Sequence, residues 1–208
     1  MARPSNTEER RGQIVQGLLR VMAERGYERA SIAEIARAAG LSAGLVHYHF
    51  THKQEVLLAL MEHLAAQSAA RVKARLERTR GGARAQVEAF LDAFLATGED
   101  ADPDAVAAWV TISAEAVRQP EVRAAYAKVV RADLGHLEEL VGSVLGRRRA
   151  RAVAAGLFAA IQGYFVLAAA APELIPPGSA AGTVKRMAAG LLEPLESQEA
   201  LESKEDPP

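Results

Sequence analysis

Two short helical segments separated by one glycine place the tightest constraint on how this 208-residue chain can fold. In residues 31–50, SIAEIARAAGLSAGLVHYHF, Ser31 and Glu34 have the spacing of a capping box, which predicts that a helix begins at Ser31. Gly40 stands where this helix would end, because glycine adopts the left-handed backbone of a helix C-terminus at little cost. Ser42 is then suited to cap a second helix. The pattern predicts a helix-turn-helix.

The second helix of the pair is expected to have one buried face and one outward face. Its apolar contacts would be Leu41, Phe50 and either Leu45 or Val46. Small residues at its N-terminus would let the helix approach base edges in the major groove of DNA, and the polar side chains around it can donate hydrogen bonds. The candidate DNA-binding residues are Ser31, Ser42, Ala43, Gly44, His47, Tyr48, His49 and Lys53.

The flanking residues help to choose between this interpretation and a helical hairpin that serves only as core. Over residues 10–64 the chain has an apolar first helix ending in Gly26 and Tyr27, then the helix-turn-helix, then Tyr48-His49-Phe50 and Lys53. This order and spacing strongly resemble the TetR family of repressors. The resemblance implies an all-α protein with a three-helix DNA-binding head, which binds a palindromic operator in double-stranded DNA as a homodimer.

Two residues of the head carry specific expectations. His47 stands where the family most often has an aromatic residue, so a titratable group replaces the usual ring contact. Operator binding that tightens below about pH 6.5 would follow if His47 contacts DNA. Lys53 is expected to contact phosphate, so that its replacement by Ala lowers the affinity for all sequences and reduces the salt slope by about one unit.

Charge is distributed unevenly along the chain. Residues 1–80 contain 13 Lys and Arg against 8 Asp and Glu, whereas residues 81–208 contain 12 against 18. A basic head on an acidic body is typical of a protein that meets phosphate at one end, although ordinary variation of surface charge is the alternative. The chain has no cysteine, which excludes disulfides and thiolate metal sites. The sequence shows no metal-ligand spacing, phosphate loop or nucleophile turn, so we expect no metal, no cofactor and no enzymatic activity.

The rest of the chain is predicted to be helical. Thr51 and Gln54 have the spacing of a second capping box, which predicts a long helix from His52 to about Arg80. Further helices are expected up to Thr97, from Asp102 and Pro103 to Gln119, from there to about Leu145, over residues 150–171 and over residues 180–195. The predicted all-α fold of about nine helices divides into a helix-turn-helix domain at 7–51, a linker helix with a ligand-binding and dimerisation domain at 52–195, and an acidic disordered tail at 196–208.

One segment invites comparison with a membrane helix. Residues 152–171 form a run of 20 residues without a charged side chain, which is long enough to span a bilayer. Nearly half of them are alanine, so transfer into lipid is much less favourable than for a leucine-rich span. We therefore expect a helix of a soluble protein, buried on several sides. The N-terminus carries charge and no apolar run, which is unlike a secretory signal, so a cytoplasmic protein without membrane contact is expected.

The body resembles one branch of the TetR family, the choline-responsive BetI-like regulators. The resemblance spans about residues 106–192 and depends on Trp109, the break at Pro120 and the Pro-rich loop after IQGYF. Where that branch often has Asp-Gly-Leu before the loop, this chain has Gln162-Gly163-Tyr164, which removes an acidic group that a cationic ligand would want. Choline is therefore not carried over as the effector. The resemblance implies a C-terminal domain that dimerises through its last two helices and encloses a small-molecule effector.

Candidate residues for these two tasks follow from their size and spacing. The small residues expected at the dimer interface, where they let helices approach closely, are Ala152, Ala155, Gly156, Ala159, Ala160 and Gly163. The residues expected around the effector are Phe90, Phe94, Trp109, Ile112, Tyr126, Gln162, Tyr164 and Phe165, each of which is more typical of a core position taken alone. The sequence thus predicts a DNA-binding regulator, most readily a repressor released by its effector. A ligand-insensitive DNA-organising protein and a small-molecule binding module without specific DNA binding are the alternatives.

Overall fold

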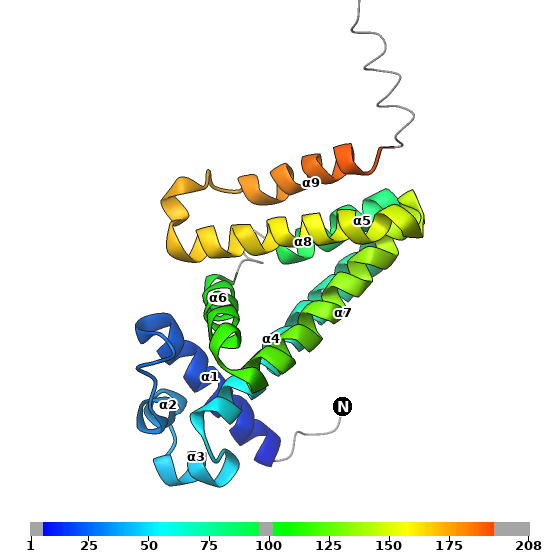
Figure 1. The fold of residues 1–208 in the computed structure, drawn as a ribbon. Coiled ribbons are helices and arrows are strands. Elements are labelled where there is room, and N and C mark those ends of the chain that lie inside the picture. Colours follow the sequence, from blue (N-terminus) through cyan, green and yellow to red (C-terminus); the bar gives the residue numbers. More distant parts are fainter. Residues whose placement is uncertain (1–5, 96–101, 194–208) are drawn as a thin grey trace, which may run out of the picture. The chain divides into compact units, whose positions relative to one another are not determined.

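The computed structural model describes residues 6–95 and 102–193, and within these ranges the chain forms nine α-helices and no strand. In order, they are α1 (Asn6–Arg25), α2 (Ile32–Ala39), α3 (Ala43–His49), α4 (Lys53–Arg78), α5 (Ala83–Phe94), α6 (Pro103–Arg118), α7 (Pro120–Leu145), α8 (Arg147–Ala170) and α9 (Ser179–Leu191), with a 3-10 turn, η2 (Pro172–Leu174), before α9 (Figure 1). The all-α prediction is confirmed. The expected helix ends at Thr97 and Leu195 and the tail lie outside the described residues.

The chain divides into two compact units. The first combines residues Met1–Ser68, Asp102–Val130 and Ala168–Ala170, and the second combines Ala69–Ala101, Arg131–Leu167 and Ala171–Pro208. The long helices α4 and α7 each contribute to both units. The first unit therefore contains α6 and the first part of α7 in addition to the three head helices. The sequence-based boundary at residue 51 remains a prediction.

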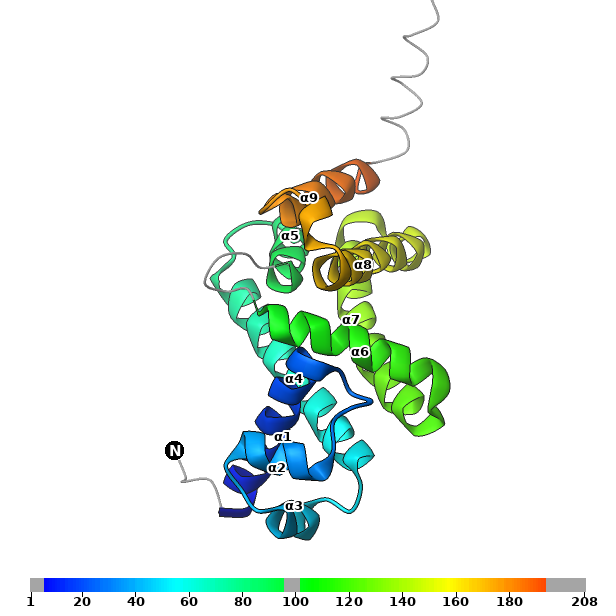
Figure 2. The ribbon, with the colours of Figure 1, turned by 90° about the vertical axis from the view of Figure 1, so that its left-hand side faces the viewer.

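A continuous apolar core holds the first unit together. Ile14 and Leu18 of α1, Ile35 of α2 and Leu57 of α4 are fully buried in it, and so is Ile112 of α6. Figure 2 shows α6 lying beside α1. Because burial of apolar area is the main favourable term in folding, α6 is as much a part of this unit as the head helices.

Helices α1 and α2 approach each other at backbone distance. A Cβ atom added at Gly17 of α1 would lie 2.7 Å from the carbonyl oxygen of Ile35 and 3.0 Å from the Cβ of Ala39. A larger residue cannot fit without moving one helix. The head thus depends on a glycine inside α1, where glycine otherwise weakens a helix.

The start of α4 differs from the sequence-based prediction. Thr51 and Gln54 do not form the expected capping box. The Thr51 amide donates to Oε2 of Glu55 at 2.7 Å, and Nε2 of Gln54 donates to Oε2 of Glu121 at 2.8 Å. The helix begins at Lys53, so the carboxylate that reaches back to Thr51 is four residues along rather than three. The capping-box prediction at this position was wrong, although the predicted helix is present.

In the second unit, α9 packs against α5. Lys185 of α9 forms an ion pair with Asp92 of α5, at 3.0 Å, and Arg84 donates to the Leu192 carbonyl at 2.9 Å. Aromatic rings join α5 to α8: the ring of Phe94 on α5 lies 5.0 Å from Phe90 on the same helix and 6.1 Å from Phe158 of α8, measured between centroids. These contacts hold the helices that carry most of the expected dimer and effector residues.

Candidate functional site

The helix-turn-helix has the local geometry that its sequence predicts. Oγ of Ser31 accepts from the Glu34 amide at 3.2 Å, and Oε2 of Glu34 accepts from the Ser31 amide at 3.0 Å, which completes the capping box. The Ser31 amide, together with its hydroxyl, holds the pKa of the Glu34 carboxyl below its usual value. Gly40 ends α2 with φ at 69°, and Oγ of Ser42 caps α3 by accepting from the Leu45 amide at 3.2 Å.

Helix α3 is anchored on one side and open on the other. Val46 is fully buried and Phe50 is 2% exposed, so Val46, rather than Leu45, takes the deeper of the two alternative positions. Tyr48 is 80% exposed. The other candidate residues at the tip and outward face, Ser42, Ala43, Gly44 and His47, are exposed as well, while His49 is half-buried. The helix therefore presents a small N-terminal tip and polar rings outward.

An arginine of α1 fixes the far end of α3. Nη1 of Arg11 donates to the His49 carbonyl at 2.9 Å, and its guanidinium carbon lies 4.1 Å from the centroid of the Phe50 ring. The arginine satisfies a carbonyl at the C-terminus of α3 and stacks on the residue that anchors it. Sequence reasoning missed Arg11, because nothing in a run of exposed arginines shows which one folds back on residues 38 positions away.

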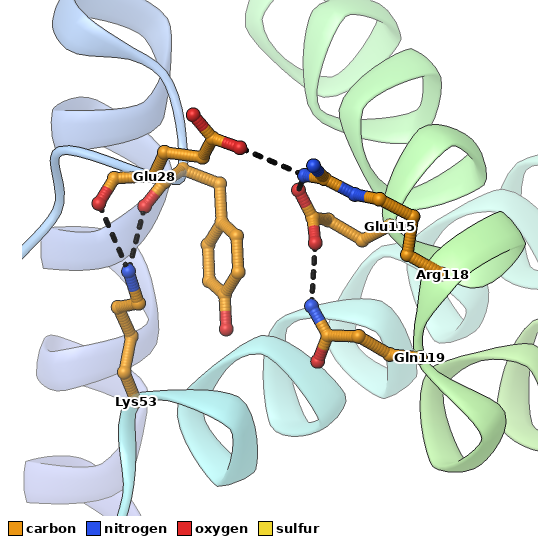
Figure 3. Close-up of polar contacts among 6 residues, drawn as sticks. Glu28, Lys53, Glu115, Arg118 and Gln119 are labelled. Carbon is orange, nitrogen blue, oxygen red and sulfur yellow. Dashed lines mark hydrogen bonds and ion pairs between the residues drawn. The ribbon is translucent and has the colours of Figure 1, made fainter.

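Lys53 has a structural role in addition to the phosphate contact expected for it. Its Nζ donates to the carbonyl oxygens of Tyr27, at 2.9 Å, and Glu28, at 3.2 Å, and lies 4.3 Å from the centroid of the Tyr27 ring (Figure 3). The ammonium thereby ties the turn after α1 to the start of α4. Its contact with phosphate remains a prediction.

The residues expected around an effector fall into two groups. Trp109, Ile112 and Tyr126 belong to the first unit, where the rings of Trp109 and Tyr126 lie 6.3 Å apart and burial raises the pKa of the Tyr126 hydroxyl. Those of the second unit are Phe90 and Phe94 on α5 and Gln162, Tyr164 and Phe165 on α8. Ile112, Phe90 and Phe165 are buried, and the other five are half-buried.

Sequence reasoning missed two members of the aromatic group in the second unit. The imidazole of His136 on α7 meets the Phe90 ring edge-on at 5.6 Å, and Phe158 on α8 packs against Phe94. His136 is three residues from Asp133, and burial raises the pKa of the Asp133 carboxyl to about 6. In the sequence, the spacing of Asp133 and His136, three residues apart within a predicted helix, is the signal that could have pointed to this region.

Two surface pockets of the second unit have other linings. One of about 610 Å³ lies between α7 and α8, and one of about 470 Å³ lies between α4 and α5. The first is lined by Gly135, Glu138, Glu139, Gly142, Ser143, Arg147 and Ala150, and the second by Arg71, Ala74, Arg75, Arg78, Thr79, Ala89 and Asp92. Neither contains a residue expected around the effector, so the effector contacts remain predictions.

The residues expected at a dimer interface form an open strip on α8. Ala152, Ala155, Gly156, Ala159 and Gly163 are exposed, and Ala160 is half-buried. A Cβ atom added at Gly156 or Gly163 would meet nothing within 4 Å. Large apolar side chains are also exposed on α8 and α9: Val166, Leu167, Met187 and Leu191.

Among the residues that the structure describes, no group of three or more His, Asp or Glu side chains is placed to hold a metal ion. Helix α8 is long and apolar enough to cross a membrane by length and composition, with a mean hydropathy of 1.8 over its most apolar window. Of that window, 28% is buried within the structure.

Comparison with known protein families identifies the family to which the chain belongs. Residues 14–60 match the family described as "Bacterial regulatory proteins, tetR family", and residues 83–193, more than half of the chain, match "BetI-type transcriptional repressor, C-terminal". The chain belongs to the TetR family. It is a transcriptional regulator with a helix-turn-helix head and a BetI-type C-terminal domain, and both sequence resemblances are confirmed.

Relatives that match most of the chain agree with this assignment. This TetR-family regulator is 30% identical to the "HTH-type transcriptional regulator BetI" of Proteus mirabilis, with 79% of this chain and 82% of that protein covered. It is 32% identical to the "HTH-type transcriptional activator FasR" of Mycolicibacterium smegmatis, with 73% and 68% covered. A solved structure of a regulator from Saccharomonospora viridis in complex with choline has the same fold, with a TM-score of 0.72, 22% identity, and 89% and 96% covered.

Proposed function

We propose that this TetR-family regulator is a cytoplasmic homodimer that represses transcription by binding a palindromic operator and releases the operator when a small molecule binds. The observation that carries the proposal is the geometry of α3. Val46 and Phe50 anchor the helix, while its capped N-terminus, with Ala43 and Gly44, stays exposed beside Tyr48. A short helix with a small, exposed N-terminal tip is the element that enters a major groove.

The open strip on α8 supports the homodimer. Exposed small residues and open space at Gly156 and Gly163 leave room for the backbone of a second helix, and the neighbouring exposed apolar side chains would lose water on contact. A two-fold axis at this strip presents two reading helices. Their separation then has to match the distance between operator half-sites.

Helices α6 and α4 are the elements through which an effector would act on the head. Trp109 and Ile112, which we expect near the effector, lie on α6 in the same compact unit as the head, and α4 runs through both units. A small molecule that binds one arrangement of these helices more tightly shifts the population toward it, and release follows if that arrangement mismatches the half-site spacing. Choline is bound by the Saccharomonospora viridis relative. In this chain, Gln162 lies where an acidic group is common, so the effector is to be identified by screening.

Selection of bound sequences from a random duplex pool at physiological salt tests the proposal. The expected result is an enriched palindrome bound by a dimer, with an affinity that falls steeply as salt rises. A pool of metabolites is then screened for compounds that release this duplex. Release supports a repressor with an effector, whereas tighter binding would refute the release step and show that the small molecule strengthens operator binding.

The two alternatives give different results in the same experiment. A ligand-insensitive DNA-organising protein would bind with steep salt dependence but enrich no motif. A small-molecule binding module without specific DNA binding would show no salt-dependent duplex binding. Either result from folded, full-length protein would refute the proposed function.

A further inference from the structure

The last turn of α6 holds a buried carboxylate inside the unit that contains the head. Glu115 is 5% exposed, and Glu115 and Ser68 are the two buried polar side chains among the described residues. Oε1 of Glu115 accepts from Nη2 of Arg118 at 2.9 Å, and its Oε2 accepts from Nε2 of Gln119. Both oxygens therefore have donors, as a buried carboxylate requires. The arrangement fixes the Arg118 side chain at the end of α6.

From this position Arg118 reaches the head. The same Nη2 atom donates to Oε1 of Glu28 at 2.8 Å, and Glu28 lies in the turn between α1 and α2 (Figure 3). Hydrogen bonding to Glu28, and next to Glu115, raises the pKa of the Arg118 guanidinium, and the same contact lowers the pKa of the Glu28 carboxyl. One guanidinium nitrogen thus bridges a buried carboxylate on α6 and an exposed carboxylate on the head.

The turn that carries Glu28 is held from its other side by Lys53. The lysine binds the backbone carbonyls of Tyr27 and Glu28, whereas Arg118 binds the Glu28 side chain. Three residues after Glu28 the chain reaches Ser31, the cap of α2. The turn that leads into α2 is therefore contacted by both the start of α4 and the end of α6.

The ion pair between Arg118 and Glu28 is exposed to solvent, so its effect on protein stability differs from its effect on the orientation of the turn. The side chains of Arg118 and Glu28 are 61% and 75% exposed, and an exposed ion pair contributes little to the free energy of unfolding. The pair can nevertheless select one orientation of the turn, because the partner of Arg118 on α6 is buried and fixed. Loss of the Glu28 carboxylate alone should alter the head without unfolding the protein.

We propose that Arg118 is a positioning residue for DNA binding, which sets the orientation of the reading helix by clamping Glu28 of the head to Glu115 of α6. The inference rests on the proposed function, and it adds the contact through which α6 acts on the head. Trp109 and Ile112 lie on the same helix as Glu115 and Arg118. A displacement of α6 by an effector is passed to the turn before α2 by this clamp.

The decisive variant is Glu28→Gln, with Glu24→Gln as its matched control. Glu24 is an exposed glutamate of α1 close to the same turn, so its replacement removes one head carboxylate without touching Arg118. Two properties are measured: amide hydrogen exchange of residues 26–31 in the protein without DNA, and affinity for the selected palindrome with zero, one or two base pairs inserted between its half-sites. Thermal unfolding is recorded alongside.

We expect Glu28→Gln to speed exchange in residues 26–31 by about two- to fivefold and to reduce the preference for the original spacing by a similar factor, with thermal unfolding unchanged. Glu24→Gln should match the wild type in all three. In an Arg118→Gln background the Glu28 substitution should have no additional effect, since the interaction it removes is already lost.

Wild-type exchange rates and an unchanged spacing preference in Glu28→Gln would overturn the clamp. A wild-type protein that selects no palindrome would instead refute the proposed function. In that case the exchange measurement still decides whether Arg118 holds the turn.

Discussion

The side chain of Tyr48 on α3 is 80% exposed, although Val46 and Phe50, two residues before and after it, are buried. A large ring gains little stability in such a position, so its effect should be on binding. Tyr48→Ala is expected to weaken operator binding by about tenfold or more, which corresponds to about 1.4–3 kcal/mol for one lost base or backbone contact, without lowering the melting temperature. Titration of labelled operator checks the affinity. An affinity equal to that of the wild type would mean that the Tyr48 ring lies outside the DNA interface.

Because of the Asp133 carboxyl, we expect the free energy of unfolding to depend on pH. Burial raises the pKa of its carboxyl to about 6, from an ordinary value of 3.8, so between these values the native protein binds more protons than the unfolded chain. Stability is therefore lost as pH rises from about 4 to 6, because the partly buried carboxylate becomes charged. Asp133→Asn should be more stable than the wild type by about 1–2 kcal/mol at pH 8, after allowance for solvent screening, with no gain at pH 4. Urea denaturation at both pH values measures this difference, and an equal gain at pH 4 would contradict it.

At the scale of elements, two glycines of α1 should respond in opposite ways to the same substitution. Gly17→Ala places a methyl group against the Ile35 carbonyl and Ala39, and should lower the free energy of unfolding by about 1–3 kcal/mol. A Cβ atom at Gly12 meets nothing within 4 Å, so Gly12→Ala should raise it by up to about 1 kcal/mol through helix propensity. Chemical denaturation of the two variants gives the comparison. Equal effects would show that the contact between α1 and α2 tolerates separation.

Helix ends could be predicted from the sequence where the signal is local. The Ser31 and Glu34 box, the turn at Gly40, the Ser42 cap and the Asp102 cap are each made by residues within three or four positions. The box expected at Thr51 failed for a related reason: two acceptable partners stood one residue apart, and the tertiary contact with Glu121 took Gln54. Local sequence patterns predict that a helix is present, but they do not always predict which residue caps it.

Contacts between distant elements could not be predicted in this way. Arg118 and Glu28 are 90 positions apart, and each is an ordinary exposed charge in the sequence. The size of a side chain predicts a candidate effector residue, but it cannot show that Trp109 and Phe90 belong to different compact units. The helix-turn-helix was easier to predict, because α2, α3 and their caps occupy one continuous stretch of chain.

At the scale of the whole molecule, operator binding should depend on a surface remote in sequence from the head. The open strip on α8 has room for a side chain at Gly156, so Gly156→Leu should leave the isolated subunit as stable as the wild type or slightly more so. In a dimer packed through this strip, the same leucine would force two helices apart. We expect the dimer to dissociate at least about tenfold more readily, a cost of about 1.4 kcal/mol, and the affinity for the palindrome to fall with it, because one head alone contacts one half-site. Sedimentation velocity over a concentration series measures the dimer, with Gly12→Leu as a control that adds the same side chain to open space on α1. A Gly156→Leu dimer as tight as that of the wild type would place the subunit interface elsewhere, and the exposed Val166 and Leu167 would then need a different explanation.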